Sequence, residues 1–361
     1  MDTPPRARRL ARLVGRYLLP GAIVLASLLP ARASAPASAA ATATAEALAP
    51  VPAVTGYALG GLGDAVLRRD APHLSTVTVA GVAIDAAGRR VAAPSADVTR
   101  LLAKAQAAGL RAELLLSNYS DRLGDFDTRA VDRLLTHPSR IEGVASQLAE
   151  HAVSLGVDGV NVDLEALRPR DAAGLVDLLA RLREALPQGT AISIDVSARS
   201  SRSAYAEAGY DLAGIASIVD VVQLMTYDQH GPTWSGPGPI GALAWQRRCL
   251  EAALEDVPAE RLDLGVAGYG YSWPRRGTGR SLSVARARAL AEASDRGARW
   301  HDDTAEWSAR LDDGTRLWWS DARSYEVRRT LAAQFGLHGL AVWRLGSADP
   351  LTGDAAGGST G

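Results

Sequence analysis

Short apolar runs rich in β-branched residues alternate with amphipathic stretches along most of the chain, from about Val51 to about Gly346. A short apolar run predicts a buried strand, whereas apolar residues spaced three and four apart predict a helix that packs on one face. Strands and helices in regular alternation indicate parallel strands joined by crossover helices. We therefore predict eight strands, at residues 54–57, 76–84, 112–117, 159–165, 191–197, 219–227, 263–271 and 340–344.

The segments between these strands include stretches with clear helical spacing, at residues 96–108, 144–155, 173–185, 242–254 and 324–335. Gly109 and Gly336 follow two of these stretches and suit the left-handed conformation that often ends a helix. Eight strands with intervening helices predict an α/β fold, a (β/α)8 TIM barrel that spans residues 51–346.

Residues 274–323, which follow the seventh predicted strand, do not fit the barrel pattern. Two stretches within them, 298–302 and 316–319, have strand character and flank a turn sequence at residues 312–314 (DDG). We expect a small α+β lobe inserted into the barrel, with these two stretches as the arms of a hairpin.

The two ends of the chain differ in composition from the predicted barrel. Residues 1–33 contain an arginine-rich start, an apolar stretch at 17–29 and the triplet ARA, which together are typical of a signal peptide. The apolar stretch is shorter than the roughly 20 residues of a membrane-spanning helix. Residues 34–50, almost wholly Ala, Ser, Thr and Pro, predict a flexible linker, and residues 347–361 predict a disordered tail. We expect a secreted, periplasmic or cell-envelope protein.

The composition excludes several kinds of partner. The 39 Lys and Arg residues nearly balance the 40 Asp and Glu residues, so nucleic acid and an anionic membrane are not expected partners. Cys249 is the only cysteine, so no intramolecular disulfide can form, and we interpret it as a structural residue. The six histidines lack the spacing of a metal site, so we expect neither a metal nor another cofactor.

The strand predicted at residues 159–165 carries the most informative sequence, DGVNVDLE at residues 158–165. Side chains alternate along a strand, so Asn161, Asp163 and Glu165 share one face and the intervening apolar residues share the other. In a barrel the apolar row faces the helices, and the polar row points inward, toward the mouth where such barrels place their active sites. An isolated Asp-x-Glu usually lies on a solvated strand, but a parallel strand is covered on both faces.

The spacing of the two acids constrains the chemistry. Residues two apart on a strand lie about 6.6 Å apart on one line, so Asp163 and Glu165 approach a substrate from the same side and are poorly placed to act as acid and nucleophile on opposite faces of a sugar. A sugar with a 2-acetamido group supplies the nucleophile itself. Glu165 would then protonate the leaving oxygen, while Asp163 orients the acetamido nitrogen and helps to keep Glu165 protonated.

At these residues the sequence resembles glycoside hydrolase family 18, whose signature on the fourth strand is Asp-x-x-Asp-x-Asp-x-Glu. Asp158, Asp163 and Glu165 match the first, third and fourth acids, and Asn161 replaces the second. The amide can hydrogen-bond Asp163 but cannot share a proton as a carboxylic acid does, so the resemblance leaves the rate and pH optimum open.

A second match lies on the sixth predicted strand, where residues 223–228 (QLMTYD) resemble the family's Gln-x-Met-x-Tyr-Asp segment. Gln223, Met225 and Tyr227 share one face of that strand. The resemblance implies that Tyr227 donates a hydrogen bond to the acetamido carbonyl, that Asp228 binds a sugar hydroxyl, and that Met225 packs beneath the site. Taken alone, the segment also suits an ordinary core strand.

A third match is the last strand and its end, residues 339–346 (GLAVWRLG), which resembles the family's final strand. The resemblance implies that Trp343 forms the floor of the sugar site, where an indole face suits the apolar face of a pyranose. Weaker parallels add Tyr57, Asn118 and Tyr269 as binding candidates at the barrel mouth. The resemblance spans about residues 51–346 and is nearest to the bacterial branch that acts on cell-wall or spore-cortex glycans.

The sequence therefore predicts a secreted glycosidase, monomeric, that cleaves β-linked N-acetylglucosamine polysaccharide by substrate-assisted retaining catalysis. Glu165, Asp163 and Tyr227 are the catalytic candidates. Whether the polymer is chitin or the glycan of peptidoglycan stays open, as does endo or exo action. One alternative is a lectin that keeps the sugar groove without hydrolysis. A second is a glycosidase with two carboxylates, in which Asp228 faces Glu165.

Overall fold

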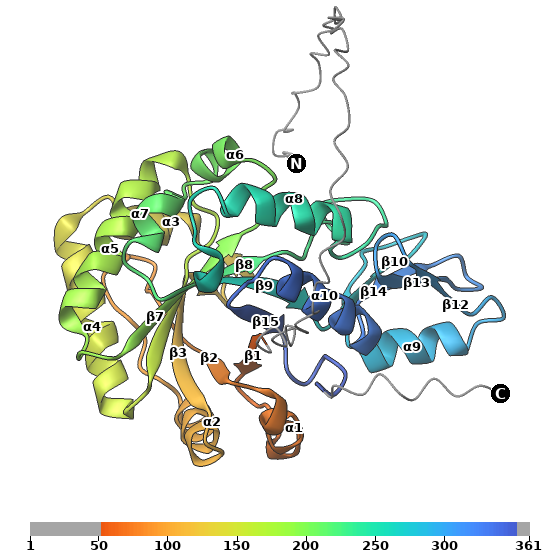
Figure 1. The fold of residues 1–361 in the computed structure, drawn as a ribbon, viewed down its shortest axis with the longest axis horizontal. Helices are drawn as coiled ribbons and strands as arrows, with labels where there is room; N and C mark the ends of the chain where they lie inside the picture. Colours follow the sequence, from red (N-terminus) through yellow and green to blue (C-terminus); the bar gives the residue numbers. More distant parts are fainter. Residues whose placement is uncertain (1–51, 352–361) are drawn as a thin grey trace, which may run out of the picture. The chain divides into compact units, whose positions relative to one another are not determined.

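A closed barrel of eight parallel strands forms the centre of the computed structural model, which describes residues 52–351 (Figure 1). The strands follow the order β1-β15-β9-β8-β7-β6-β3-β2 around the barrel. Their bounds are β1 Ala53–Leu59, β2 Thr76–Ala83, β3 Arg111–Ser117, β6 Gly159–Asp163, β7 Ala191–Ser197, β8 Val221–Met225, β9 Leu262–Ala267 and β15 Gly339–Trp343. All eight predicted strands are present, and the predicted (β/α)8 barrel is confirmed. The predicted signal peptide and linker lie outside the described residues.

Closure of the barrel depends on the first and last strands, which pair in parallel with Ala53 opposite Gly339. A Cβ atom at Gly339 would lie 2.2 Å from the carbonyl oxygen of Ala53, so only glycine allows these backbones to approach. The same strand pairs with β9 on its other side, where Gly339 faces Asp263. The sheet therefore has no free edge between the two ends of the barrel sequence.

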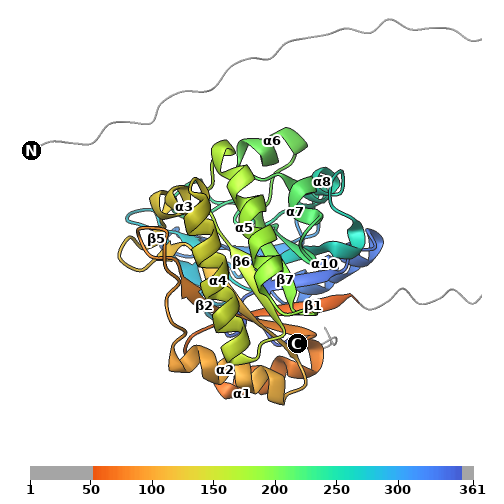
Figure 2. The same ribbon diagram turned by 90° about the vertical axis from the view of Figure 1, so that its left-hand side faces the viewer.

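Helices surround the barrel, and Figure 2 shows α4 and α5 side by side on its outer face. Their bounds are α1 Asp64–Asp70, α2 Ala96–Ala107, α3 Thr128–Leu135, α4 Pro138–Leu155, α5 Ala172–Ala185, α6 Arg202–Glu207, α7 Leu212–Ala216, α8 Leu243–Ala253 and α10 Ala322–Gln334, with short 3-10 turns at Ala71–His73, Pro169–Asp171 and Ala259–Arg261. Among the described residues, no helix combines the length and the apolar character that crossing a membrane requires.

Local sequence signals set several of these helix ends. The Ser95 side chain accepts a hydrogen bond from the backbone of Val98 and so caps α2, and the Asp321 side chain does the same at the start of α10. Gly156 ends α4 in the left-handed region, with φ at 61°. Gly109 and Gly336 also have positive φ, as predicted for glycines that end helices.

The main core lies between the barrel strands and the helices. Val160, Val162 and Leu164 of the fourth barrel strand are at most 1% exposed and belong to this core. Asn161 and Asp163 alternate with them and point into the barrel, which agrees with the predicted alternation. Cys249 of α8 is fully buried, and burial raises the pKa of its thiol to about 12, so it belongs to the packing and not to the chemistry.

The inserted segment forms an antiparallel sheet in the order β11-β10-β14-β13-β12, with α9 Val284–Glu292 packed on it (Figure 1). Its strands are β10 Gly270–Trp273, β11 Ser281–Leu282, β12 Ala298–His301, β13 Glu306–Arg310 and β14 Arg316–Trp319. A smaller hairpin, β4 Tyr119–Ser120 with β5 Asp125–Phe126, follows β3.

The structure corrects three details of the sequence interpretation. β14 pairs across the 312–314 turn with β13, which the sequence analysis missed, and β12 pairs with β13 as well. The strand predicted at 263–271 ends at Ala267, because the next residues enter the lobe sheet as β10. The tail predicted from residue 347 is packed as far as Leu351, which is 4% exposed and donates its backbone N–H to Asp70, while Asp349 pairs with Arg288 at 2.6 Å.

Candidate active site

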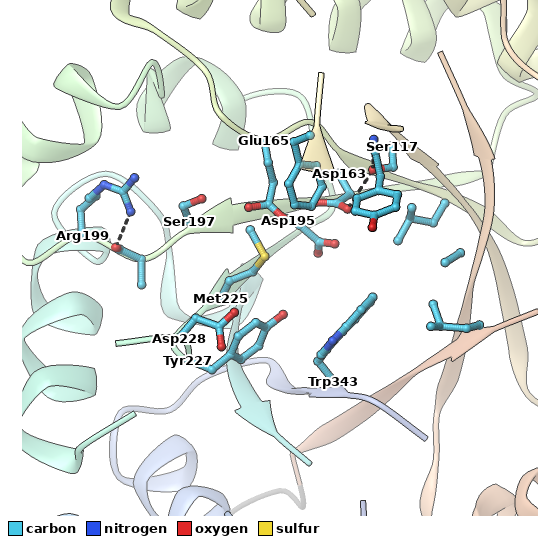
Figure 3. Close-up of a pocket in the computed structure, with 16 residues that line it drawn as sticks. Ser117, Asp163, Glu165, Asp195, Ser197, Arg199, Met225, Tyr227, Asp228 and Trp343 are labelled. Carbon is cyan, nitrogen blue, oxygen red and sulfur yellow. Dashed lines mark hydrogen bonds between the residues drawn. The ribbon is translucent and has the colours of Figure 1, made fainter. Parts of the chain in front are cut away.

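A cavity of about 630 Å³ opens at the carboxyl ends of the barrel strands (Figure 3). Loops and strand ends from β1, β2, β3, β6, β7, β8 and β15 contribute its walls. The lining residues are Leu59, Ala80, Leu115, Ser117, Tyr119, Phe126, Asp163, Glu165, Asp195, Ser197, Ala198, Arg199, Met225, Tyr227, Asp228 and Trp343. The three catalytic candidates predicted from the sequence therefore lie in one cavity, with Met225, Asp228 and Trp343.

β6 delivers the two predicted catalytic acids to the cavity. Asp163 is its last residue and is 8% exposed, and Ser117 at the end of β3 donates a hydrogen bond to its Oδ2 at 3.3 Å. Glu165 follows two residues later, beyond the strand, and is half-buried. The next residue, Ala166, has φ at 58°, so the chain leaves the barrel in a tight turn directly after Glu165.

Asn118 holds this turn in place. Its Oδ1 accepts a hydrogen bond from the backbone N–H of Glu165 at 2.8 Å, and its Nδ2 donates to the carbonyl of Glu165 at 3.0 Å. The side chain is 1% exposed and is not among the lining residues. Asn118 was predicted to bind substrate, but its amide is used to position the backbone of Glu165.

Burial and neighbouring charges raise the pKa values of the acids in the cavity. Removal from water raises the pKa of Asp163 to about 7. Burial, followed by the negative charges of Asp163 and Asp195, holds the pKa of Glu165 well above its usual value. Because neighbouring like charges disfavour full ionisation, the raised pKa of Glu165 favours its protonated form, the form that a general acid requires.

Asp195 is a site residue that the sequence analysis did not identify. It lies on β7, is 3% exposed, and lines the cavity beside the β6 acids. It accepts hydrogen bonds from the Tyr57 hydroxyl and, at 3.3 Å, from Nδ2 of Asn161. The sequence does contain a signal for Asp195. In the predicted strand at 191–197, Ser193, Asp195 and Ser197 share one polar face.

Three predicted binding residues lie beneath the cavity and not among its lining residues. Tyr57, Asn161 and Gln223 are each at most 2% exposed. The Tyr57 hydroxyl donates to Asp195 and to Gln223, and the Asn161 amide donates to the Gln223 side chain at 3.2 Å. These residues therefore form the support under the acids.

A chain of hydrogen bonds continues from this support into the barrel. Nδ2 of Asn161 donates to the Ser193 hydroxyl at 3.0 Å, and Ser193 donates to the buried carboxylate of Glu113 at 2.9 Å. Thr78 on β2 donates to the same carboxylate oxygen at 2.9 Å. Four barrel strands are thus connected through polar side chains below the cavity.

The end of β8 supplies Met225, Tyr227 and Asp228 to the cavity. Asp228 has φ at 58°, so the chain turns sharply there as it does after Glu165. Its carboxylate accepts hydrogen bonds from the hydroxyls of Tyr269 and, at 2.8 Å, of Tyr271. Tyr269 is 5% exposed and does not line the cavity, so the structure places this predicted binding residue behind Asp228.

Aromatic side chains form the apolar part of the wall. Trp343 lines the cavity and packs on Tyr57 with 5.4 Å between ring centroids and a tilt of 58°. Tyr119 and Phe126 of the small hairpin contact each other edge-on at 5.5 Å and line the cavity too. These two residues were not predicted from the sequence, because their position depends on the hairpin after β3.

The cavity can thus bind an apolar ring face on Trp343 beside a protonated carboxyl, a second carboxyl and a tyrosine hydroxyl. Figure 3 shows Glu165, Asp163 and Tyr227 around the same space. Within residues 52–351, no group of three or more His, Cys, Asp or Glu side chains could hold a metal ion. The arrangement suits acid-base chemistry on a sugar.

Comparison with known proteins agrees with this geometry. The profile of the family described as Glycosyl hydrolases family 18 matches residues 119–348, more than half of the chain. The chain is 24% identical over 260 residues to the uncharacterized glycosylase YvbX of Bacillus subtilis, with 69% of this chain and 75% of that protein covered. It is 27% identical over 247 residues to the cortical fragment-lytic enzyme of the same organism, with 64% of this chain and 55% of that enzyme covered.

Solved structures share the fold. A chitinase from Chromobacterium violaceum superposes with a TM-score of 0.75 at 27% identity, over 83% of this chain and 96% of that one. The spore cortex-lytic enzyme SleL of Bacillus cereus superposes with a TM-score of 0.74 at 19% identity, over 83% of this chain and 72% of that one.

Proposed function

The chain belongs to glycosyl hydrolase family 18 and is a glycosidase, and from this premise we propose that it cleaves β-linked N-acetylglucosamine polysaccharide with the substrate's own acetamido group as nucleophile. The observation that carries the proposal is the meeting of Asp163, Glu165, Tyr227 and Trp343 in one cavity. These residues come from three strands that are far apart in the sequence, so the order of the barrel brings them together.

The first step is the breakage of the glycosidic bond. The sugar lies on Trp343, and Glu165 gives its proton to the leaving oxygen as the bond from the anomeric carbon to that oxygen breaks. The acetamido oxygen of the same sugar forms a new bond to the anomeric carbon and closes a five-membered ring. The raised pKa of Glu165 supports this role, because the carboxyl then keeps its proton to a higher pH than an ordinary glutamic acid does.

Asp163 and Tyr227 act on the acetamido group. Asp163 accepts the N–H of the amide, which orients the group and stabilises the positive charge that the nitrogen gains when the ring closes. Tyr227 lines the same cavity, and in the proposed mechanism its hydroxyl donates a hydrogen bond to the acetamido oxygen. Tyr227 stays protonated throughout, because burial and the nearby acids raise its pKa.

The second step is hydrolysis of the ring. Glu165, now a carboxylate, removes a proton from water as the water oxygen bonds to the anomeric carbon. The bond to the acetamido oxygen breaks, the amide is restored, and Glu165 regains its proton. Two displacements at the same carbon return it to its original configuration, so we propose a retaining reaction.

Replacement of Glu165 by glutamine tests the proposal. Glu165→Gln should lower hydrolysis of chitin oligomers by more than roughly 100-fold, because general acid catalysis contributes on this order, while oligomer binding measured by calorimetry stays near that of the unchanged protein. Glu207→Gln is the matched control, since Glu207 is an exposed glutamate on α6. An unchanged protein that binds oligomers but never cleaves them would instead support the lectin.

A substrate analogue separates the two glycosidase mechanisms. A β-linked glucose oligomer of the same length lacks the acetamido group and should not be cleaved. Efficient cleavage of the glucose oligomer would contradict substrate assistance and favour a second carboxylate, with Asp228 as the candidate because it also lines the cavity.

We also propose that the protein is secreted, periplasmic or attached to the cell envelope. The support is the sequence of residues 1–33, with its arginine-rich start and short apolar stretch. Expression of the full chain followed by fractionation and sequencing of the mature N-terminus tests this. Recovery of uncleaved protein from the cytoplasm alone would contradict it.

A further inference from the structure

Arg199 is the one basic residue among those that line the cavity. The charged lining residues are otherwise the four acids Asp163, Glu165, Asp195 and Asp228. Arg199 follows β7 by two residues, so it is part of the loop that leaves the barrel beside Asp195. A single guanidinium in an acidic cavity is expected to form an ion pair with one of the acids.

Arg199 forms no ion pair within 4.0 Å with any acid in residues 52–351. Its side chain donates from Nη1 to the carbonyl oxygen of the preceding residue, Ala198, at 2.8 Å. A guanidinium has five N–H donors in a planar fork that matches a carboxylate. Most of these donors remain available to a group that enters the cavity.

The segment that carries Arg199 is held by the buried side chain of Tyr210. The hydroxyl of Tyr210 accepts the backbone N–H of Ser197 at 3.4 Å. The hydroxyl of Tyr210, which is 3% exposed, donates to the Ser197 side chain at 3.3 Å. These contacts fix the backbone at the end of β7, two residues before Arg199.

The position of Arg199 indicates which part of a substrate it meets. Figure 3 shows Arg199 and Trp343 on opposite sides of the cavity, with Met225 between them and Glu165 along one side of the space. If the sugar that is attacked rests on Trp343, the sugar on the far side of the scissile bond extends past Glu165 toward Arg199. Arg199 therefore lies on the side of the leaving group.

We propose that Arg199 binds a carboxylate on the sugar in the leaving-group position. The inference rests on the proposed function and names its substrate class: a glycan that alternates N-acetylglucosamine with a sugar bearing a carboxylate. N-acetylmuramic acid has such a group, a lactyl carboxylate, whereas chitin has none. The fork of Arg199 would pair with it and would offset its repulsion by the four acids.

The test uses three glycans that differ in charge at one place. The first is peptidoglycan glycan freed of its peptides, so that each lactyl carboxylate is ionised. The second is the same glycan with these carboxylates converted to neutral methylamides, and the third is a chitin oligomer of equal length. The variants are Arg199→Gln, Arg199→Lys and the control Arg122→Gln, which removes an exposed positive charge on the hairpin at the cavity mouth.

Arg199→Gln should lower kcat/KM for the ionised glycan roughly tenfold or more, the range for loss of a charge-assisted hydrogen bond. For the methylamide glycan and the chitin oligomer the change should stay below about twofold, since neither offers the partner that gives this bond its strength. Arg199→Lys should recover part of the loss, because it keeps the charge but not the fork. Arg122→Gln should leave kcat/KM nearly unchanged for all three glycans at about 0.15 M salt, where long-range electrostatic attraction is screened.

Binding to the Glu165→Gln protein, with and without Arg199→Gln, separates this inference from the proposed function. A preference for the ionised glycan that disappears with Arg199 supports the inference even if the unchanged protein hydrolyses none of the glycans, an outcome that would contradict only the proposed function. Equal loss on all three glycans, or no loss on any, overturns the inference whether or not hydrolysis occurs. Thermal melting of each variant checks that it is folded.

Discussion

The side-chain amide of Asn161 donates a hydrogen bond to the carboxylate of Asp195 on the neighbouring strand, at 3.3 Å. Asn161 occupies the position where the family signature has its second acid, and Asp195 of β7 brings a carboxyl to within hydrogen-bond distance of the Asn161 amide. The cluster therefore has a third carboxyl beside Asp163 and Glu165, although the β6 motif itself has lost one. This arrangement explains how Asn161 is compatible with a family 18 site.

Removal of the Asp195 charge should impair catalysis and change its pH dependence. The negative charge of Asp195 raises the pKa of Glu165, so Asp195→Asn should move the alkaline limb of the kcat/KM profile to lower pH and lower the maximal rate roughly tenfold. Steady-state rates across pH measure both effects. An unchanged profile would contradict the proposed role.

A carboxyl exchange serves as the control for this prediction. The double variant Asn161→Asp with Asp195→Asn returns the acid to β6 and keeps the charge of the cluster. The double variant should recover part of the activity and move the alkaline limb of the kcat/KM profile back toward higher pH. Asn161→Asp alone should destabilise the protein, because it adds a further buried carboxylate. Failure of the exchange to recover activity would mean that Asp195 is needed at its own position.

Asp163 should make the protein less stable as the pH rises. Its pKa is about 7 in the folded protein against 3.8 ordinarily, so between these values the folded protein keeps a proton that the unfolded chain has released, and the free energy of unfolding falls. From about pH 4 to pH 8, Asp163→Asn should therefore gain roughly 2–4 kcal/mol relative to the unchanged protein. Urea denaturation at a series of pH values measures the difference. Asp121→Asn, at an exposed position, is the control for the same substitution.

The buried pair of Glu306 and Arg328 should be a major determinant of stability. Both are 1% exposed and lie 3.1 Å apart, and Glu306 also accepts the backbone N–H groups of Ile240 and Gly241. Glu306→Gln leaves Arg328 buried without a charged partner, so it should cost about 3–5 kcal/mol. Denaturant titration measures the loss.

A partly exposed ion pair on α10, the helix of Arg328, provides the comparison for the buried pair. Arg329 pairs with Glu326 at 2.8 Å and is 39% exposed. Arg329→Gln should cost less than about 1 kcal/mol, as is usual for a surface pair. Similar losses for Glu306→Gln and Arg329→Gln would show that the buried pair has no special weight.

The sequence was sufficient for the barrel but not for the pairing inside the lobe. Each barrel strand shows a local apolar run, and a parallel strand pairs with a neighbour whose place is set by the crossover rule. The lobe strands are antiparallel and short, and β13 combines Glu306 with Trp307 in no clear alternation. The packing of Leu351 beside Asp70 was also missed, because it is a contact between residues far apart in the chain.

The candidate site also has a part that was predicted from the sequence and a part that was not. Asp163, Glu165, Tyr227, Asp228 and Trp343 follow from strand-end motifs, and the structure places them in one cavity. The sequence could not distinguish residues that line the cavity from those that support it, because both groups alternate on the same strand faces. The supporting group comprises Tyr57, Asn118, Asn161, Gln223 and Tyr269.

The polar chain from Asn161 through Ser193 to Glu113 has a consequence for engineering. Glu113 does not line the cavity, yet two hydrogen bonds separate it from the amide that contacts Asp195. Refilling the barrel centre with aliphatic side chains to gain thermostability would cut this connection and leave Asn161 with fewer partners. Libraries that aim to stabilise this enzyme should therefore vary the residues that pack between the strands and the helices. They should leave the polar residues inside the barrel unchanged.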